Sequence, residues 1–151
     1  MTTWPLPPPM ARALELARIG ESEGEVPIGA VVTRGGEVVG EGYNRPRALH
    51  DPTAHAEILA IRAAAEALGN ERLEGCDLWV TLEPCAMCAG AIAHARIARL
   101  YYGAVDSKGG GVEHGARVFD QAQCLHRPEV YSGIGEGEAA ALLREFFARR
   151  R

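Results

Sequence analysis

Apolar residues recur every three or four positions in several segments of the chain, which is the spacing of one helix face. Pro84 stands where one of these segments begins, a position that suits proline at the start of a helix. Gly69 and Asn70 follow another segment, as is common just after a helix C-terminus. The helices predicted from this pattern cover residues 10–19, 54–68, 85–95 and 136–149.

Short apolar runs bounded by glycine or polar residues predict strands between the helices. Gly35 and Gly36 separate the first two runs, which indicates a β-hairpin. A loop is expected over residues 106–115, which hold four of the 18 glycines. The predicted strands are 28–33, 38–43, 78–82, 100–102 and a weaker one around Val130.

Strands that alternate with helices indicate a layered α/β fold, with a mostly parallel sheet after the opening hairpin. The chain has 151 residues, a typical length for one domain, and it contains no internal repeat and no linker. We therefore expect a single domain over residues 1–151.

Charge and targeting signals narrow the function classes only a little. The 16 Lys and Arg against 20 Asp and Glu give a net charge of −4, without the basic excess typical of nucleic-acid-binding chains. A local basic face can coexist with such a total. The start MTTWPLPPPM resembles no signal peptide, and no run approaches the roughly 18 apolar residues that cross a membrane. We expect a soluble, cytoplasmic protein whose four cysteines are ligands or buried thiols.

Two motifs that can bind a metal stand where predicted helices begin. His55-Ala56-Glu57 opens one helix, and Pro84-Cys85-Ala86-Met87-Cys88 opens the next. Cys85 and Cys88 are three positions apart and share one helix face in the first turn, where the helix dipole favours thiolate. Two thiolates and one imidazole suit zinc, and three protein ligands leave a fourth position open, as in catalytic zinc sites. The motifs therefore predict one zinc ion per chain, bound by His55, Cys85 and Cys88.

Glu57 is predicted to move protons rather than to bind the metal. Residues two apart point in nearly opposite directions within a helix, so His55 and Glu57 can serve one site only at the helix entry. Hydrolytic deamination needs a base for the attacking water and an acid for the leaving ammonia, and one carboxylate can do both in turn. A His-x-Glu motif combined with Pro-Cys-x-x-Cys is the known pattern of zinc nucleobase deaminases.

Other interpretations of the cysteines fit less well. Cys-x-x-Cys alone can be a redox pair or half of a structural zinc site. No second such pair exists, and Cys76 and Cys124 do not supply one by spacing. A redox pair would leave the His-x-Glu motif unexplained. A zinc-stabilised binding module without catalysis would leave Glu57 without a purpose.

Longer stretches around these motifs resemble a known family. They are EVPIGAVV (25–32), GYNRP (42–46), HDPTAHAEI (50–58) and TLEPCAMCAGAI (81–92). On these stretches the chain resembles the cytidine-deaminase-like superfamily, and within it the bacterial tRNA adenosine deaminases, which convert the wobble adenosine of a tRNA to inosine. The resemblance is weaker through YYGAVDSKGG and returns in ALLREFFARRR at the end of the chain.

The resemblance implies a three-layer α-β-α sandwich with a five-stranded mixed sheet. It also implies a homodimer that buries apolar surface of the predicted helix 85–95, near residues 89–92. It implies zinc binding by His55, Cys85 and Cys88, and acid–base work by Glu57. For the substrate it implies a hydrogen bond from Asn44, backbone contacts near Ala56 and near Leu82 and Glu83, and a pocket lined by Val26.

One loop departs from the tRNA enzymes, which tend to continue their glycine-rich loop with Gly-Ser and an apolar stretch. Here Glu113 and His114 stand between Gly111 and Phe119, near the expected substrate. A carboxylate repels phosphate but can accept hydrogen bonds from the ring N–H or amino groups of a free base. Two substrates therefore stay open: the wobble adenosine of a tRNA anticodon loop, and a free nucleobase or nucleoside (guanine, cytosine, cytidine or adenosine). The long motif matches favour the tRNA.

A tRNA substrate would require basic side chains for the phosphates that flank its target base. Arginines near the end of the last helix can complement the helix dipole or contact phosphate, and the first role is preferred. These arginines are Arg144 and residues 149–151, and the candidates near the site are Arg45, Arg47, Lys108, Arg117 and Arg127.

The remaining chemically notable residues are expected to be structural. Cys76 and Cys124 are interpreted as small buried side chains, and Trp4 and Trp79 as packing anchors. His94 is expected to pack or face solvent on its helix, and His50 is expected at the surface.

Overall fold

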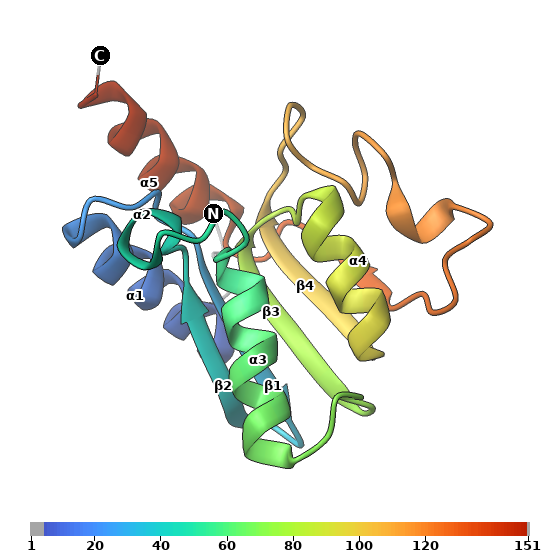
Figure 1. Ribbon diagram of the computed structural model, residues 1–151. Helices are drawn as coiled ribbons and strands as arrows, with labels where there is room; N and C mark the ends of the chain where they lie inside the picture. Colours follow the sequence, from blue (N-terminus) through green and yellow to red (C-terminus); the bar gives the residue numbers. More distant parts are fainter. Residues whose placement is uncertain (1–4, 151) are drawn as a thin grey trace.

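A five-stranded sheet in the order β2-β1-β3-β4-β5 forms the centre of the molecule (Figure 1). The computed structural model describes residues 5–150. The strands are β1 (Gly29–Arg34), β2 (Glu37–Tyr43), β3 (Cys76–Leu82), β4 (Arg99–Ala104) and β5 (Glu129–Tyr131). All five predicted strands are present, and the weakest prediction, around Val130, corresponds to the shortest of them.

The sheet is mixed in direction. Strand β1 runs antiparallel to both β2 and β3, whereas β3, β4 and β5 run parallel to one another. Gly35 and Gly36 form the turn of the β1–β2 hairpin, and both have positive φ angles. The carboxyl ends of β3 and β4 therefore meet at one edge of the sheet, where ligands bind in many open α/β folds.

Helices cover both faces of the sheet, which confirms the predicted three-layer sandwich (Figure 1). On one face lie α3 and α4, which contact each other, and on the other face lie α1 and α5, which also contact each other. The helices are α1 (Pro8–Ser22), α2 (Pro46–Leu49), α3 (Ala56–Leu68), α4 (Ala86–Ala95) and α5 (Glu136–Ala148), with a 3₁₀ turn η1 (Val118–Asp120).

The larger hydrophobic core lies between the sheet and the α3–α4 layer. It contains Leu78 and Val80 from β3, Leu100 and Tyr102 from β4, and Ile92 from α4, all completely buried. A second cluster joins α1 to β1 on the opposite face. Because both layers pack on the same strands, the first turns of α3 and α4 are held in fixed positions relative to the sheet edge.

The sequence also led to predictions about two tryptophans and about membrane-spanning segments. Trp79 stacks on Tyr101, with ring centroids 3.9 Å apart and an interplanar angle of 6°, so its role as a packing anchor is confirmed. Trp4 lies outside the described residues. Among residues 5–150, no helix has both the length and the apolar character needed to cross a bilayer.

Candidate metal centre and active site

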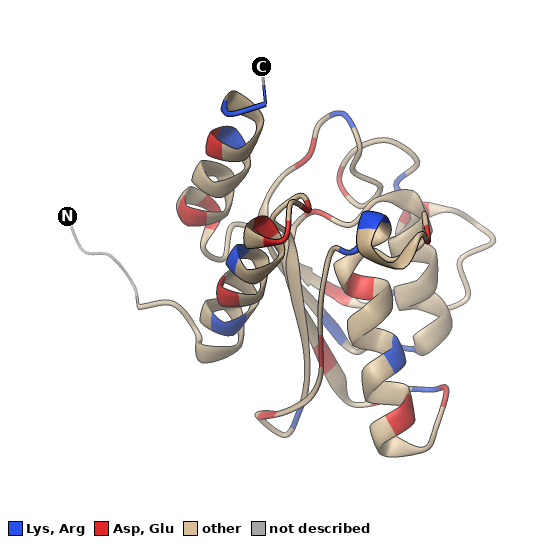
Figure 2. Cartoon of the chain, turned by 60° about the vertical axis from the view of Figure 1, so that its left-hand side comes forward, with Lys and Arg blue, Asp and Glu red and all other residues tan. Residues whose placement is uncertain are grey.

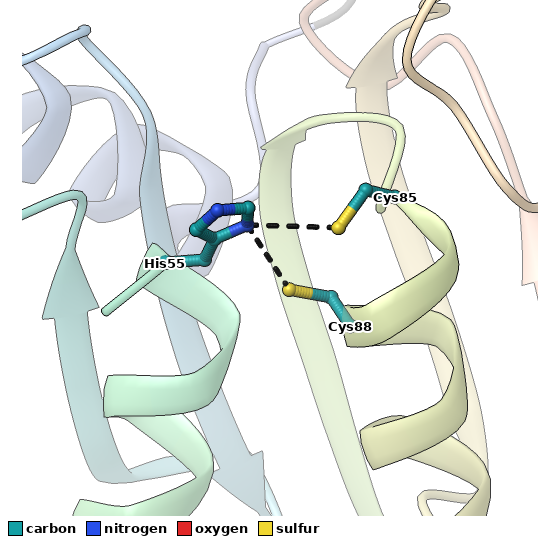
Figure 3. Close-up of side chains that lie close together, drawn as sticks. All are labelled: His55, Cys85 and Cys88. Carbon is teal, nitrogen blue, oxygen red and sulfur yellow. Dashed lines mark hydrogen bonds between the residues drawn. The ribbon is translucent and has the colours of Figure 1, made fainter. Parts of the chain in front are cut away.

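Three side chains with metal-binding atoms converge between the first turns of α3 and α4 (Figure 3). His55 is the residue before α3, with extended backbone angles (φ −76°, ψ 154°). Cys85 holds the same place before α4 (φ −73°, ψ 175°), and Cys88 lies in the first turn of that helix. Both helices thus point their N-termini, the positive ends of their dipoles, toward this cluster.

The spacing of the three side chains fits a tetrahedral zinc ion. Nδ1 of His55 lies 3.6 Å from Sγ of Cys85 and 3.5 Å from Sγ of Cys88. With Zn–S of about 2.3 Å and Zn–N of about 2.0–2.1 Å, a tetrahedral centre separates nitrogen and sulfur by about 3.6 Å. Both nitrogen–sulfur distances therefore match those around a tetrahedral zinc ion, and the three atoms all lie within 4.8 Å of one another.

The electrostatics of the cluster also favour a cation. A hydrogen bond from the Cys88 thiol and the neighbouring His55 outweigh the effect of burial and lower the pKa of Cys85 to about 4. A second thiolate beside the first is disfavoured, because the hydrogen bond with Cys85 and burial raise the pKa of Cys88. One thiolate is therefore present at neutral pH, and a bound cation supplies the charge that the second requires.

Glu57 lies in the first turn of α3, and only 4% of its surface is exposed. Burial, with a smaller contribution from the charge of Cys85, raises the pKa of Glu57 to about 7. A carboxyl group with a pKa near neutrality can both accept and return a proton. Two residues two positions apart within a helix point in nearly opposite directions. His55 lies just outside the helix, so this restriction does not apply to it, and both His55 and Glu57 can serve one site as predicted.

A turn that the sequence interpretation missed holds the backbone in front of His55. The carboxylate of Asp51 accepts hydrogen bonds from the amide (2.9 Å) and hydroxyl (2.7 Å) of Thr53, whose carbonyl in turn accepts the His55 amide at 2.7 Å. An Asp-Pro-Thr sequence is a recognisable turn signal of this kind. Asp51 therefore acts on the metal centre through the path of the backbone.

Three predicted substrate residues lie around the same helix entry. The amide of Arg45 donates to the carbonyl of Ala54, which brings the buried Asn44 beside the residues that precede His55. The amide of Asn44 donates to Ile28, whose own amide donates to Val26. Ala56, the first residue of α3, is completely buried and stands between His55 and Glu57 in the chain. A chain of backbone hydrogen bonds thus connects the segment of Val26 and Asn44 to the residues that precede His55.

The other predicted substrate residues are held by protein groups. The Glu83 carboxylate is completely buried and binds residues of the 106–114 loop, including the Nδ1 of His114 at 2.8 Å. The carboxylate of Glu113 accepts a hydrogen bond from the hydroxyl of Tyr102 on β4. Substrate contacts by Glu83, Glu113 and His114 stay predictions.

The residues that were expected to be structural differ in how far they are buried. His50 and His94 are exposed, and Cys76 is completely buried. Cys124 is half-buried and its thiol donates to the carbonyl of His126. Arg144 is exposed on α5.

Comparison with known proteins identifies the family. The family model named cytidine and deoxycytidylate deaminase zinc-binding region matches residues 8–104. The chain belongs to this family. A tRNA-specific adenosine deaminase of Agrobacterium fabrum is 58% identical over 142 residues, which are 94% of this chain and 93% of the relative.

Solved structures extend the similarity to the fold. A chain from a study of A-to-I editing by tRNA:A34 deaminases at the wobble position matches with a TM-score of 0.88 and 58% identity, over 89% of this chain and 98% of that one. Guanine deaminase from Nitrosomonas europaea matches with a TM-score of 0.76 and 28% identity, over 93% and 83%. These findings confirm the predicted hydrolytic deaminase and its fold.

Proposed function

We propose that this deaminase converts the wobble adenosine of a tRNA to inosine, and that it works in the cytoplasm. The observation that carries the proposal is the 58% identity, over 94% of the chain, to a relative named tRNA-specific adenosine deaminase. The structure that matches with a TM-score of 0.88 comes from work on wobble-position deaminases and supports the same substrate. An anticodon loop presents bases that are already unstacked, so a compact single domain can reach the target base.

We further propose that the resident metal is zinc, one ion per chain, held by His55, Cys85 and Cys88. The distances of 3.5 and 3.6 Å between Nδ1 and the two sulfurs support it. Zinc with three protein ligands supplies Lewis-acid chemistry and lowers the pKa of water. The first turns of α3 and α4 fix the ligands, so their geometry does not depend on a flexible loop.

Glu57 is assigned the proton transfers. Its carboxylate takes a proton from the attacking water and later delivers a proton to the amino group, which leaves as ammonia. Burial in the first turn of α3 keeps this group beside the reaction and away from bulk solvent. Asn44 and the backbone near Ala56 are assigned to hold the base, and Val26 to line its pocket.

Acidic and basic residues are interspersed along the chain (Figure 2), so a tRNA would have to bind among charges of both signs. Arg117 and Arg127 both pair with Asp120, and Arg45 lies 3.8 Å from Glu23. Lys108 is exposed in the 106–114 loop and makes no ion pair within residues 5–150. Lys108 is therefore the most available basic group for phosphate on the loop that follows β4.

Deamination of a free base is the second candidate. The fold similarity to guanine deaminase and the net charge of −4 favour it. Purified protein is incubated with an anticodon stem-loop that carries the wobble adenosine, and separately with guanine, cytosine, cytidine and adenosine. Chromatography for inosine and an assay for ammonia report the product. Inosine in the stem-loop supports the proposal, whereas turnover of a free base alone contradicts it.

A homodimer is also proposed, at the outer surface of α4. Ala89 and Ile92, which the sequence interpretation assigned to the interface, are instead buried in the core of the monomer. Outward-facing Met87 is 38% exposed, and Gly90 and His94 border a cavity of about 320 Å³ whose rim includes Leu125, 85% exposed. An apolar side chain as exposed as Leu125 is commonly covered in an assembly.

A further inference from the structure

Glu83 carries more hydrogen bonds than any other carboxylate described in residues 5–150, and its side chain is completely buried. Its Oε2 accepts the consecutive amides of Val112 (3.2 Å), Glu113 (2.9 Å) and His114 (3.1 Å). Its Oε1 accepts the amide of Asp106 and the ring of His114, at 2.9 and 2.8 Å. One carboxylate therefore binds both ends of the 106–114 loop.

The same loop is fitted closely to the residues that bind the metal. The amide of Gly111 donates to the carbonyl of Pro84, the one residue between Glu83 and Cys85, at 2.8 Å. A Cβ at Gly110 would lie 2.5 Å from the Glu83 carboxyl carbon, and a Cβ at Gly111 would lie 2.5 Å from the amide nitrogen of Ala86. The loop therefore packs directly against the turn that carries Cys85.

The 106–114 loop lies where a substrate is expected to bind, so the hydrogen bonds that hold it also affect the substrate site. The loop follows β4 directly, at the edge where the carboxyl ends of the parallel strands β3 and β4 meet. In open α/β sheets this edge borders the ligand site. Three consecutive glycines at 109–111 contribute no side chains to this wall, and Val112 is its one side chain in the hydrophobic core among the described residues, so an internal anchor helps to hold its shape.

We propose that Glu83 is a positioning residue: its buried carboxylate holds the 106–114 loop against the turn that carries Cys85, so that the loop forms a fixed wall of the substrate site. The proposal builds on the deaminase function and, for its RNA arm, on the proposed tRNA substrate. It also gives His114 a role, because the hydrogen bond between its Nδ1 and Glu83 fixes the orientation of the ring.

The first test compares E83Q with E25Q. An amide keeps the shape of the side chain, but its NH₂ group faces donors and loses their hydrogen bonds. Because unpaired buried donors are costly, we expect amide exchange over residues 110–114 to rise by about 10-fold or more. Glu25 is the matched control, since it is also buried and accepts the amides of Arg47 and Ala48. E25Q should raise exchange near residues 47–48 only.

Steady-state kinetics distinguish a positioning role of Glu83 from a purely structural one. E83Q should keep its zinc and raise KM for the anticodon stem-loop by about 10- to 100-fold, with a smaller change in kcat. E83D keeps the charge and should recover part of the loss. If E83Q folds poorly, the pair H114A and H114N decides, because an asparagine amide can replace Nδ1 as donor: KM should rise in H114A and fall back toward the wild-type value in H114N.

Three outcomes would overturn the proposal. They are a mobile loop with unchanged KM and kcat in E83Q, loss of zinc in E83Q, and equal KM values for H114A and H114N. A wild-type enzyme that ignores the stem-loop but deaminates guanine would overturn the tRNA substrate instead. The effect of E83Q on the KM for guanine then decides the role of Glu83.

Discussion

Gly42 on β2 lies so close to α3 that a Cβ at this position would come within 2.6 Å of the carbonyl oxygen of Ala56. Ala56 stands between His55 and Glu57, so this contact fixes the distance between the edge strand and both functional residues. G42A should destabilise the fold by about 1–3 kcal/mol, as is typical of overpacking. Thermal unfolding measures this loss, and the deamination rate should fall with it because α3 must move outward.

Gly137 supplies the matched control for G42A. It lies in the first turn of α5, where a Cβ would meet nothing within 4 Å. G137A should leave activity unchanged and stabilise the helix by about 0.5–1 kcal/mol, since alanine restricts the unfolded chain more than glycine does. If G42A unfolds at the same temperature as G137A and is equally active, the close approach of β2 to α3 does not contribute to stability or activity.

A second prediction concerns Asp51, which holds the turn in front of His55. Hydrogen bonds from the side chain and then the amide of Thr53 lower the pKa of Asp51. A lowered pKa means that the carboxylate and its bonds persist at neutral and mildly acidic pH and are lost as pH falls through that lowered value. D51A should speed removal of zinc by a chelator, by roughly 3- to 10-fold at pH 7. E66Q, an exposed change on α3, should not, and equal release rates in the two variants would exclude the role.

The elements of the fold could be predicted because each has a local signal. Apolar spacing indicated all four long helices, flanking proline or glycine supported two of them, and Gly35-Gly36 indicated the hairpin. The short α2 was missed because four residues give no helical repeat. Its amides at positions 47 and 48 are instead satisfied by the carboxylate of Glu25, a contact over more than twenty residues that no local pattern reveals.

The metal ligands and Glu57 could be predicted because each stands in a short motif at a helix start. The tasks of Glu83 and Glu113 could not, because their partners come from tertiary contacts. Glu83 binds a loop more than twenty residues away, and Glu113 accepts a hydrogen bond from Tyr102 on β4, the strand that precedes its loop. A polar residue in a loop indicates chemistry, but its sequence does not say whether a substrate or the protein receives its hydrogen bond.

Metal binding and proton transfer should separate cleanly by mutation. C85A should lose the metal and all activity, since two ligands bind zinc poorly. E57A should keep about one zinc per chain and its fold, while kcat falls by about 10⁴-fold, the upper range for acid–base catalysis. Elemental analysis with steady-state rates measures both. Zinc loss in E57A as complete as in C85A would mean that Glu57 is a ligand.

The proposed dimer is tested through the exposed apolar residues around α4. Sedimentation of the wild type at micromolar concentration should give twice the 16.2 kDa of one chain. L125E should shift it toward the monomer, because a charge at a buried apolar contact is costly. V38E changes an exposed apolar residue on β2 and should leave the dimer intact. A monomeric wild type would refute the dimer.

The final prediction separates the two substrates by salt and by Glu113. An RNA makes several phosphate contacts, so its KM should rise steeply with salt, whereas a neutral free base should show almost no slope. Glu113 already accepts the Tyr102 hydroxyl, so its charge is engaged inside the protein. For a tRNA substrate, E113Q should change the rate at most slightly, because the amide oxygen can still accept that bond. Rates on the stem-loop and on guanine, measured from low to moderate salt, decide between the cases. Turnover of guanine without a salt slope, lost in E113Q, would mean that Glu113 leaves Tyr102 to bind a base, and that the tRNA proposal is wrong.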